Sequence, residues 1–443
     1  MARRASVVFS PNANASTSLD PERLIIRHHN LQSGTIDYCQ VCGSTNLKLI
    51  IDLGHQPLCI AMLRPEQLNQ PETLYPLRYF MCQDCSLAQI NYIVPPEALF
   101  FPDYPYLSGI TNELATHLRG ISRDVVSRTP LGPDHLAVDI GSNDGTLLSG
   151  FKERNVRVVG VEPTNVAAIA RSRGIDTIQS FFSEKVAQEI VATRGKASVV
   201  TATNVFAHIQ ALGETIRGIL ALLTDDGVFV AENHYLLNIV EEIQYDSLYH
   251  EHLRSYSLKS LITLFQQYGC TVVDAERVAS YGGSLRTYVM KGATRPVSDN
   301  VAALLEVEKN AGLHSGECYP RFRSRIQKSR ARLLRLAFDA ADQGRSLVGN
   351  SCPGRATILL NYCGIDASLM PYIAEQPTSL KLGMYLPGRH IPVVNNSILF
   401  EEQPDYVVLL AWHYGQSIRR QLREKGLRSK LIMPLPDVVV YDD

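Results

Sequence analysis

The stretch Leu136-Ala-Val-Asp-Ile-Gly-Ser-Asn-Asp-Gly-Thr-Leu-Leu148 indicates the fold of this chain. Its first five residues form a short apolar run typical of a buried strand, and the chain turns helical after Gly145. Gly141 and Gly145 let the backbone approach a ligand closely, and a helix start offers unpaired N–H groups. The spacing differs from the G-x-G-x-x-G dinucleotide fingerprint. It predicts a nucleoside cofactor site at the end of a β-strand.

Further apolar runs follow this strand and alternate with helical stretches. They lie at 156–161, 199–202, 227–231 and 271–273. Such alternation is typical of β-α-β units around a mainly parallel sheet. Residues 301–342 have a helical composition, a second strand, turn and helix begin at Leu347, and 406–411 is typical of another buried strand. The predicted fold class is therefore α/β, with a Rossmann-like domain, a helical connector and a second, C-terminal Rossmann-like domain.

Glu162 stands at the end of the next predicted strand, where an acid can accept hydrogen bonds from ribose hydroxyl groups. Together with Glu162 at the end of the next strand, the glycine turn at Gly141–Gly145 is typical of S-adenosylmethionine (SAM) sites in Rossmann-like methyltransferases. A tight turn whose glycines serve only packing is the alternative. His208, after the fourth strand, borders the reacting group or is a structural histidine. The predicted cofactor-binding residues are Asp139, Gly141, Asn143, Asp144, Gly145, Glu162 and Asn204.

Two C-x-x-C pairs precede this domain, Cys39-Gln-Val-Cys42 and Cys82-Gln-Asp-Cys85, separated by 39 residues. Each pair can present two thiolates from a tight turn, and together they supply the four-sulfur set that structural zinc prefers. A redox C-x-x-C normally occurs once, at a helix start, and four unligated cysteines are the other alternative. We predict one structural zinc ion held by Cys39, Cys42, Cys82 and Cys85.

The segment Tyr249-His-Glu-His252 combines two imidazoles, a carboxylate and a phenol in four consecutive residues. It follows the cofactor strands, where a substrate would lie, and these groups suit general acid–base chemistry. A metal site is one competitor, although the H-E-x-x-H spacing is absent, and an inert polar cluster is another. The catalytic candidates are Tyr249, Glu251 and His252. Arg286, in a glycine-containing segment, is a candidate to face an anionic substrate.

Composition excludes several classes of protein. Of the 443 residues, 45% are hydrophobic and 20% are charged, which predicts a globular chain. The 43 Lys and Arg residues nearly balance the 44 Asp and Glu residues, which argues against a protein that mainly neutralises nucleic-acid phosphates. The nine cysteines do not form the pattern of a disulfide framework, and no apolar run has the length of a membrane span. We therefore expect a cytoplasmic protein that binds neither nucleic acid nor a membrane.

Five segments are predicted along the chain. They are an N-terminal tail at 1–36, a zinc-binding module at 37–110, the SAM domain at 111–292, a helical connector at 293–345 and a C-terminal α/β domain at 346–443.

Together these motifs resemble the C-methyltransferases of deoxysugar biosynthesis, which methylate nucleotide-linked 4-keto-6-deoxy sugars. The resemblance runs from about Cys39 to Asp437 in the order of that family: the zinc module, the SAM motif, the Tyr249–His252 signature and Gly282–Arg286. Three stretches resemble the C-terminal domain of the family, at 359–364, 386–392 and 404–412.

The resemblance implies a reaction and a role for each residue. His252 is implied to remove the proton from the carbon beside the ketone, while Tyr249 and Glu251 position it and the enolate. Tyr106 is implied to reach the sugar. The enolate then attacks the methyl group of SAM.

The C-terminal domain is expected to hold the diphosphate-nucleotide half of the substrate. A strand, a glycine-containing turn and a helix start at 347–355 form an anion site from backbone N–H groups. Arg355, where relatives frequently have Lys, adds a planar guanidinium group that can form two parallel hydrogen bonds to a phosphate. Arg389 is expected to face the same cleft. A purely structural domain is the alternative.

The favoured function is a SAM-dependent sugar C-methyltransferase with a structural zinc ion, which acts as a monomer or homodimer on a nucleotide-diphosphate sugar. Two alternatives stay open. One is O- or N-methyl transfer to a related nucleotide sugar, which needs no ketone. The other is a non-catalytic protein whose zinc module binds a partner or nucleic acid.

Overall fold

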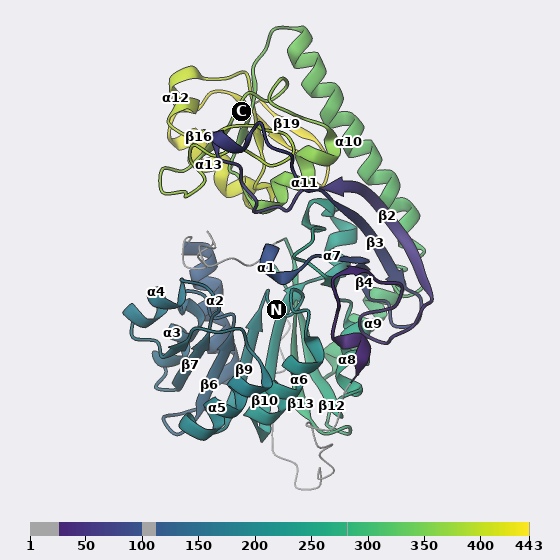
Figure 1. Cartoon of the computed structure of the whole chain (residues 1–443), viewed down its shortest axis with the longest axis vertical. Coiled ribbons are helices and arrows are strands. Elements are labelled where there is room, and N and C mark those ends of the chain that lie inside the picture. The colour runs from purple at the N-terminus through teal and green to yellow at the C-terminus, as the bar shows by residue number, and fades with distance from the viewer. Residues whose placement is uncertain (1–25, 100–111, 281, 443) are drawn as a thin grey trace.

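The computed structural model describes residues 26–99, 112–280 and 282–442. Figure 1 shows two lobes, a larger one built on a seven-stranded sheet and a smaller one built on a six-stranded sheet. Helix α10 (Cys318–Asp342) and the hairpin of β2 (Leu47–Gln56) and β3 (Tyr75–Cys82) run beside each other along one side of the molecule. Arg323 of α10 donates a hydrogen bond to the carbonyl oxygen of Ile50 at 3.0 Å, which ties the helix to the hairpin.

The larger sheet has the strand order β12-β13-β10-β9-β6-β7-β8. Strand β13 is antiparallel to both of its neighbours, and the other pairs are parallel. The strands are β6 (Leu136–Ile140), β7 (Arg157–Val161), β8 (Thr177–Ile178), β9 (Ala197–Thr203), β10 (Leu223–His234), β12 (Cys270–Val278) and β13 (Ser284–Lys291). Every residue of β6 is buried, as expected of a parallel strand covered on both faces. The mainly parallel sheet predicted from the alternating apolar runs is confirmed.

The glycine turn leads directly into a helix, as predicted. Gly145 has a φ of 77°, a left-handed conformation that glycine adopts without a Cβ clash, and α3 (Thr146–Lys152) begins at the next residue. The other helices of this lobe are α2 (Asn112–Arg128), α4 (Ala167–Ser172), α5 (Glu184–Arg194), α6 (Leu212–Leu222), α7 (Leu236–Glu241) and α8 (Leu258–Gln266).

The Cys-rich module forms a four-stranded antiparallel sheet in the order β11-β4-β3-β2. Strand β4 (Ala88–Ile90) lies inside the sheet, and the edge strand β11 (Arg254–Ser255) comes from the middle of the chain. The module is therefore not an independent unit, because residues just after the Tyr249–His252 segment complete its sheet. Its smaller elements are β1 (Gly34–Thr35), β5 (Tyr92–Ile93) and α1 (Pro96–Leu99).

Part of the predicted tail belongs to the folded body. His29, Leu31 and Ile36 are buried, and His29 Nε2 donates a hydrogen bond to the carbonyl oxygen of Val41 at 2.7 Å. Residues 26–36 are therefore part of the zinc module rather than of a separate tail, because these side chains pack into it. Residues 1–25 lie outside the described part of the chain.

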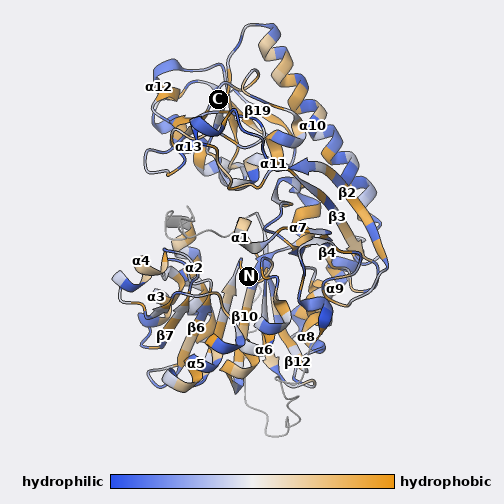
Figure 2. Ribbon diagram, viewed as in Figure 1, coloured by the Kyte–Doolittle hydropathy of each residue, from blue (hydrophilic) through white to orange (hydrophobic). Residues whose placement is uncertain are grey.

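Two helices lead to the smaller lobe, α9 (Asp299–Asn310) and α10, within the region predicted to be helical. The buried residues of α10 recur at intervals of three and four, which gives the helix one apolar stripe; they are Tyr319, Phe322, Ile326, Ser329, Leu333, Ala337 and Ala340. Figure 2 shows the resulting alternation of hydrophobic and hydrophilic residues along this helix.

The smaller sheet has the strand order β16-β15-β14-β17-β18-β19 and is parallel except for β19. Its strands are β14 (Leu347–Asn350), β15 (Ile373–Glu375), β16 (Val393–Asn395), β17 (Tyr406–Leu409), β18 (Lys430–Met433) and β19 (Val439–Tyr441), and its helices are α11 (Gly354–Cys363), α12 (Ile398–Glu402) and α13 (Gly415–Glu424). After β14 the chain adds β15 and then β16 on one side of this strand, and it then crosses to the other side, where it adds β17 and then β18. The carboxyl ends of β14 and β17 are therefore the topological switch point, where such sheets bind ligands.

One hydrophobic cluster extends from Cys39 in the zinc module to Val438 in the smaller lobe, so the lobes share a continuous core.

The limits of the five predicted segments stay a proposal. Among the described residues, no helix combines the length and the apolar composition that crossing a bilayer requires.

Candidate functional site

The four cysteines of the two C-x-x-C pairs come together in the structure. We call Cys39–Cys42 the first knuckle and Cys82–Cys85 the second knuckle. Their sulfur atoms lie within 4.8 Å of one another, because the pairing of Leu47 with Cys82 brings both knuckles to one end of the β2–β3 hairpin. Cys39, Cys82 and Cys85 are buried, and Cys42 is partly exposed. Zinc–sulfur bonds of about 2.3 Å require tetrahedral sulfur separations of about 3.8 Å. The set therefore fits one structural zinc ion.

The predicted cofactor-binding residues gather where β6, β7 and β9 end. Asp139 belongs to β6, Glu162 follows β7 and Asn204 follows β9, and the parallel pairing places these ends side by side. Burial raises the pKa of Asp139 to about 7, although a hydrogen bond from Thr201 opposes the shift. The side-chain nitrogen of Asn204 is buried and has no hydrogen-bond partner among the described residues. A bound nucleoside can satisfy this donor, so the site fits SAM.

Three residues shape the turn itself. A Cβ atom at Gly141 would lie 2.5 Å from a Val205 methyl carbon, and Gly145 is left-handed, so both positions require glycine. Asp144 is buried, and its carboxylate accepts hydrogen bonds from the N–H and hydroxyl groups of Thr146 at 3.2 and 2.7 Å. The predicted residue Asp144 therefore holds the start of α3.

Glu162 connects the end of β7 to the glycine turn. Its Oε2 accepts a hydrogen bond from the backbone N–H of Asn143 at 3.0 Å, and its Oε1 accepts from the N–H and hydroxyl groups of Thr164 at 2.9 and 2.6 Å. Each carboxylate oxygen has two lone pairs, so Glu162 can fix Asn143 and still accept from ribose hydroxyl groups.

We predict that Glu162→Gln weakens SAM binding by about 10- to 100-fold, because hydrogen bonds to a charged acceptor contribute roughly twice as much as those to a neutral amide. Isothermal titration with SAM measures the effect. Glu189→Gln, an exposed residue on α5 with the same change of charge, is the matched control and should bind SAM as the wild type does. Unchanged affinity in Glu162→Gln would contradict the assignment.

His252 lies among other aromatic side chains. Its ring centroid is 4.0 Å from that of Tyr249, 4.8 Å from that of His208 and 5.8 Å from that of His234. The His252 Nδ1 is 2.7 Å from the carbonyl oxygen of Ser247. Because a carbonyl oxygen only accepts, Nδ1 carries the proton, and the lone pair on Nε2 can take up another. His252 is partly exposed, so a substrate can reach it.

The surroundings keep this imidazole neutral. Burial lowers the pKa of His252 well below its usual value, and positive charge on His208 or His234 lowers it further. The hydrogen bond to Ser247 opposes the shift without reversing it. A neutral imidazole is the form that acts as a base.

Glu251 and His250, the two middle residues of the signature, are both buried. The charge of Glu251 adds to burial in raising the pKa of the Cys59 thiol. The contact that orients His252 through Nδ1 comes from Ser247, not from Glu251. His250 is also buried, and its Nε2 donates a hydrogen bond to the carbonyl oxygen of Pro76 at 3.2 Å, which is a structural contact.

Arg355 of the smaller lobe faces residues 246–254, the segment that contains His252, which we call the catalytic segment. It is 7% exposed, and its Nε lies 3.2 Å from a carboxylate oxygen of Asp246. The indole nitrogen of Trp412 donates to the same oxygen at 2.7 Å, and the guanidinium group lies 5.1 Å above the Trp412 ring. The predicted phosphate contact of Arg355 is therefore not supported, because a carboxylate from the larger lobe already balances its charge.

Arg389 does not face the same cleft as Arg355. Arg355 lies in the first turn of α11, whereas Arg389 donates a hydrogen bond to the carbonyl oxygen of Asn361, near the last turn, at 2.8 Å. Arg389 also lines an open hollow of about 360 Å³ that includes Asp366. The prediction of a shared cleft is wrong, because the turn that carries Arg389 packs against the opposite end of the helix.

Arg286 is buried in an ion-pair network. Its Nε is 2.8 Å from Glu232 on β10, and one terminal nitrogen is 3.1 Å from Asp124 and 3.2 Å from Glu276. These contacts join β13 to β10, β12 and α2, so the predicted contact of Arg286 with an anionic substrate is not supported. Tyr106 lies outside the described residues.

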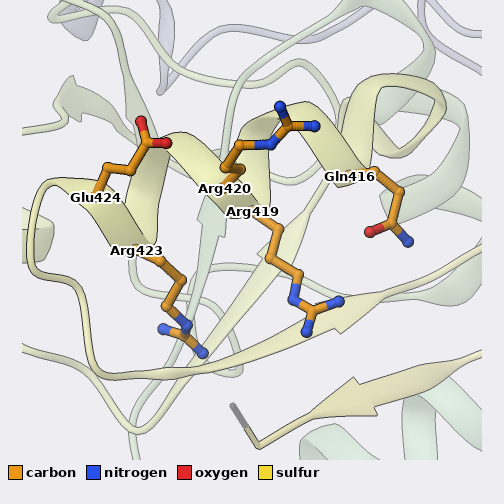
Figure 3. A pocket seen from close by; sticks show the side chains of 5 residues that line it. All are labelled: Gln416, Arg419, Arg420, Arg423 and Glu424. Atoms are coloured by element: carbon orange, nitrogen blue, oxygen red, sulfur yellow. The ribbon is translucent and has the colours of Figure 1, made fainter.

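A surface hollow of about 380 Å³ lies on α13 and contains none of the predicted site residues. Figure 3 shows Arg419 and Arg423 on the same side of this helix. Arg419 lies 4.2 Å above the ring of Tyr441, and Arg423 donates to the carbonyl oxygen of Leu427 at 2.7 Å. These cations stabilise the packing of α13, and the candidate active site is the one around His252.

Sequence reasoning missed Ser247, His234 and His413. Arg355 donates a hydrogen bond to Nδ1 of His413 at 3.1 Å, so Nδ1 of this imidazole is an acceptor and Nε2 carries its proton. His413 is partly exposed and lies just beyond β17, at the switch point of the smaller sheet. Its position at the end of a predicted strand is the signal that could have found it. Ser247 acts through its backbone and gives no such signal.

Three family models match successive parts of the chain. A zinc binding domain matches residues 39–100, a methyltransferase domain matches 115–275, and a C-methyltransferase C-terminal domain matches 279–436. The chain is 33% identical over 407 residues to the C-methyltransferase NovU of Streptomyces niveus, a match that covers 91% of this chain and 96% of that protein.

Solved methyltransferase structures match a smaller part of the chain. A SAM-dependent methyltransferase from Anabaena variabilis is 14% identical, with 42% of this chain and 88% of that chain covered and a TM-score of 0.33. The 1,6-didemethyltoxoflavin-N1-methyltransferase of Burkholderia thailandensis is 18% identical, with 40% and 78% covered and a TM-score of 0.31.

Proposed function

We infer the reaction from the premise that this chain belongs to the family of SAM-dependent C-methyltransferases that includes NovU. The protein is an enzyme that transfers a methyl group to carbon, and it contains a zinc-binding domain. Its substrate is a small molecule. This membership excludes a purely non-catalytic protein, so the open questions are which compound is methylated and how its carbon is activated.

We propose that the substrate is a nucleotide-linked 4-keto-6-deoxy sugar, methylated on a carbon next to the ketone. The observation that supports this proposal is the neutral His252, whose Nδ1–H is held by Ser247. A C–H bond next to a carbonyl group is acidic enough for such a base to break, because the carbonyl oxygen takes the charge. An unactivated C–H bond is not.

The proposed reaction starts with the removal of a proton by His252. The Nε2 atom of His252 takes the proton, and the electrons of the C–H bond form an enolate whose negative charge lies on the former ketone oxygen. SAM supplies an electrophilic methyl group on a positively charged sulfur. As the enolate carbon forms the new bond to this methyl group, the sulfur–methyl bond would break, its electrons would stay on sulfur, and S-adenosylhomocysteine would leave as the neutral product. The ketone is restored, and His252 releases its proton to water. In this proposal Tyr249, whose ring packs against His252, donates its hydroxyl proton toward the enolate oxygen.

Residues of the glycine turn and Glu162 would hold SAM, and the smaller lobe would hold the nucleotide half of the substrate. The support for the second role is the switch point where β14 and β17 end, because doubly wound sheets bind ligands there. Trp412 and His413 lie at this point and contact Arg355, which contacts the catalytic segment through Asp246. Remote binding of this kind lowers the cost of positioning the reacting carbon.

The test is product analysis with ¹³C-methyl SAM and a uniformly ¹³C-labelled nucleoside-diphosphate 4-keto-6-deoxy sugar. A one-bond carbon–carbon coupling between the new methyl group and the sugar is the expected result in NMR spectra. A methylated sugar without this coupling would support O- or N-methyl transfer instead. Binding of SAM without any methylated sugar would show that the substrate class is wrong.

A further inference from the structure

Gln40 lies between two of the knuckle cysteines and reaches the catalytic segment. It is the second residue of the Cys39–Cys42 knuckle and is fully buried, with 0% of its surface exposed. Its side-chain nitrogen donates hydrogen bonds to the carbonyl oxygen of Ile90 at 3.0 Å and to that of Leu253 at 3.2 Å. Leu253 directly follows His252, so one side chain joins the cysteine cluster to the residue after the proposed base.

Two further hydrogen bonds reinforce this link. The N–H group of Gln40 donates to Oε1 of Gln89 at 2.8 Å, and the N–H group of Ile90 donates to the carbonyl oxygen of Leu253 at 3.2 Å. Gln89 also pairs with Arg254 in the ladder between β4 and β11. The first knuckle, β4 and residues 253–255 therefore form one continuous hydrogen-bonded unit.

Arg254 connects the same unit to the segment that carries His208. Its guanidinium group is buried and donates to the carbonyl oxygen of Ile209, the residue after His208, at 2.7 Å. Two of its nitrogens are buried without a hydrogen-bond partner in the described part of the chain. Burial lowers the pKa of Arg254.

We infer that Gln40 is a positioning residue for methyl transfer, because it fixes the backbone at Leu253 and thereby the orientation of the His252 imidazole. This inference rests on the proposed role of His252 as the base. A misplacement of about 1 Å at a reacting group costs about 10²-fold in rate. Loss of the Gln40 amide should therefore lower the rate of the chemical step without removing any group that touches SAM.

The second knuckle provides a matched control. Gln83 holds the same position between Cys82 and Cys85 as Gln40 holds in the first knuckle. It is partly exposed, and its side-chain nitrogen contacts the sulfur of Met81 at 3.3 Å. Gln83→Met therefore changes the knuckle without touching the catalytic segment.

The experiment compares Gln40→Met, Gln83→Met and the wild-type enzyme, each as the full chain with zinc. Gln40→Met should retain one equivalent of zinc and its affinity for SAM, and its KM for the sugar nucleotide should stay within about 3-fold. Its kcat should fall by about 10- to 100-fold, as expected of a displaced base. Hydrogen exchange followed by mass spectrometry should show faster exchange of the backbone amides at 249–255. Gln83→Met should match the wild type in every measurement.

Two results would overturn the inference: a wild-type exchange rate at 249–255 in Gln40→Met, or equal losses in both variants. If Gln40→Met does not fold, Gln40→Asn takes its place, since it keeps the amide and shortens the side chain by one methylene group. Amide exchange is measured without substrate and therefore tests the positioning link directly. Absence of a C-methylated product from the wild-type enzyme would instead overturn the proposed function.

Discussion

Replacing His252 with alanine is expected to lower kcat by about 10²- to 10⁴-fold, the range that a general base contributes. Only the Nε2 lone pair of this imidazole is available for the substrate, because Nδ1–H is bound to Ser247. The variant should also lose incorporation of deuterium at the carbon beside the ketone in heavy water, which NMR measures. Its affinity for SAM should be unchanged, since the residues predicted to bind SAM lie in other loops.

His55→Ala, at an exposed position on β2, is the matched control and should retain wild-type kcat. Deuterium incorporation at the wild-type rate in His252→Ala would mean that another residue is the base. His208 and His234 would then be the candidates, because their rings lie closest to His252 among the other histidines described. His250 is a poorer candidate, since its Nε2 donates to a backbone carbonyl group.

The same prediction has a consequence for pH. Because the pKa of His252 lies well below the usual 6.5, the neutral base persists as the pH falls through that value. At saturating SAM, which removes the influence of Asp139 on cofactor binding, kcat/KM for the sugar should stay level between about pH 8 and 6.5. A decline centred at pH 6.5 would indicate a base with an ordinary pKa.

Replacing Cys82 with serine is expected to remove the zinc ion and to lower Tm by more than about 10 °C. Structural zinc contributes about 10–16 kcal/mol of apparent binding free energy in small zinc modules, and about 2–4 °C of Tm accompanies each kcal/mol in domains of 150–250 residues. The effect should spread beyond the module, because its core is continuous with that of both lobes. Elemental analysis and differential scanning calorimetry measure the two changes.

Cys318→Ser is the control for this substitution. Cys318 is a partly exposed cysteine at the start of α10 and lies outside the four-sulfur cluster. It should keep one equivalent of zinc and the wild-type Tm. Folded wild-type protein with less than about half an equivalent of zinc, and with a Tm that a chelator does not change, would refute the zinc assignment.

Local patterns were sufficient to predict the fold class. The strands at Leu136–Ile140 and Leu347–Asn350 and the helix after Gly145 follow from buried apolar runs and from a left-handed glycine, which depend only on neighbouring residues. The cysteine cluster was predictable for the same reason, because each C-x-x-C turn presents two sulfurs by itself. The antiparallel hairpin then brings the two turns together.

The partners of charged side chains were not predictable in this way. Arg286, Arg355 and Arg389 each suggested an anionic ligand, yet all three guanidinium groups bind other parts of the protein. Asp246, which pairs with Arg355, lies more than one hundred residues away along the chain. A single sequence shows that a cation is present but not which carboxylate or carbonyl oxygen folding brings to it.

The sequence by itself determined the α/β class, the four-sulfur set, the glycine turn with Glu162 and the Tyr249–His252 signature, because each is encoded by residues close together in the chain. Only the tertiary structure decided the protonation and orientation of His252, which depend on a carbonyl group at Ser247 and on burial beside His208 and His234. It also decided that Gln40 of the zinc knuckle contacts Leu253 across 213 positions of sequence. Contacts of this kind depend on how separate elements pack, and no local pattern specifies that packing.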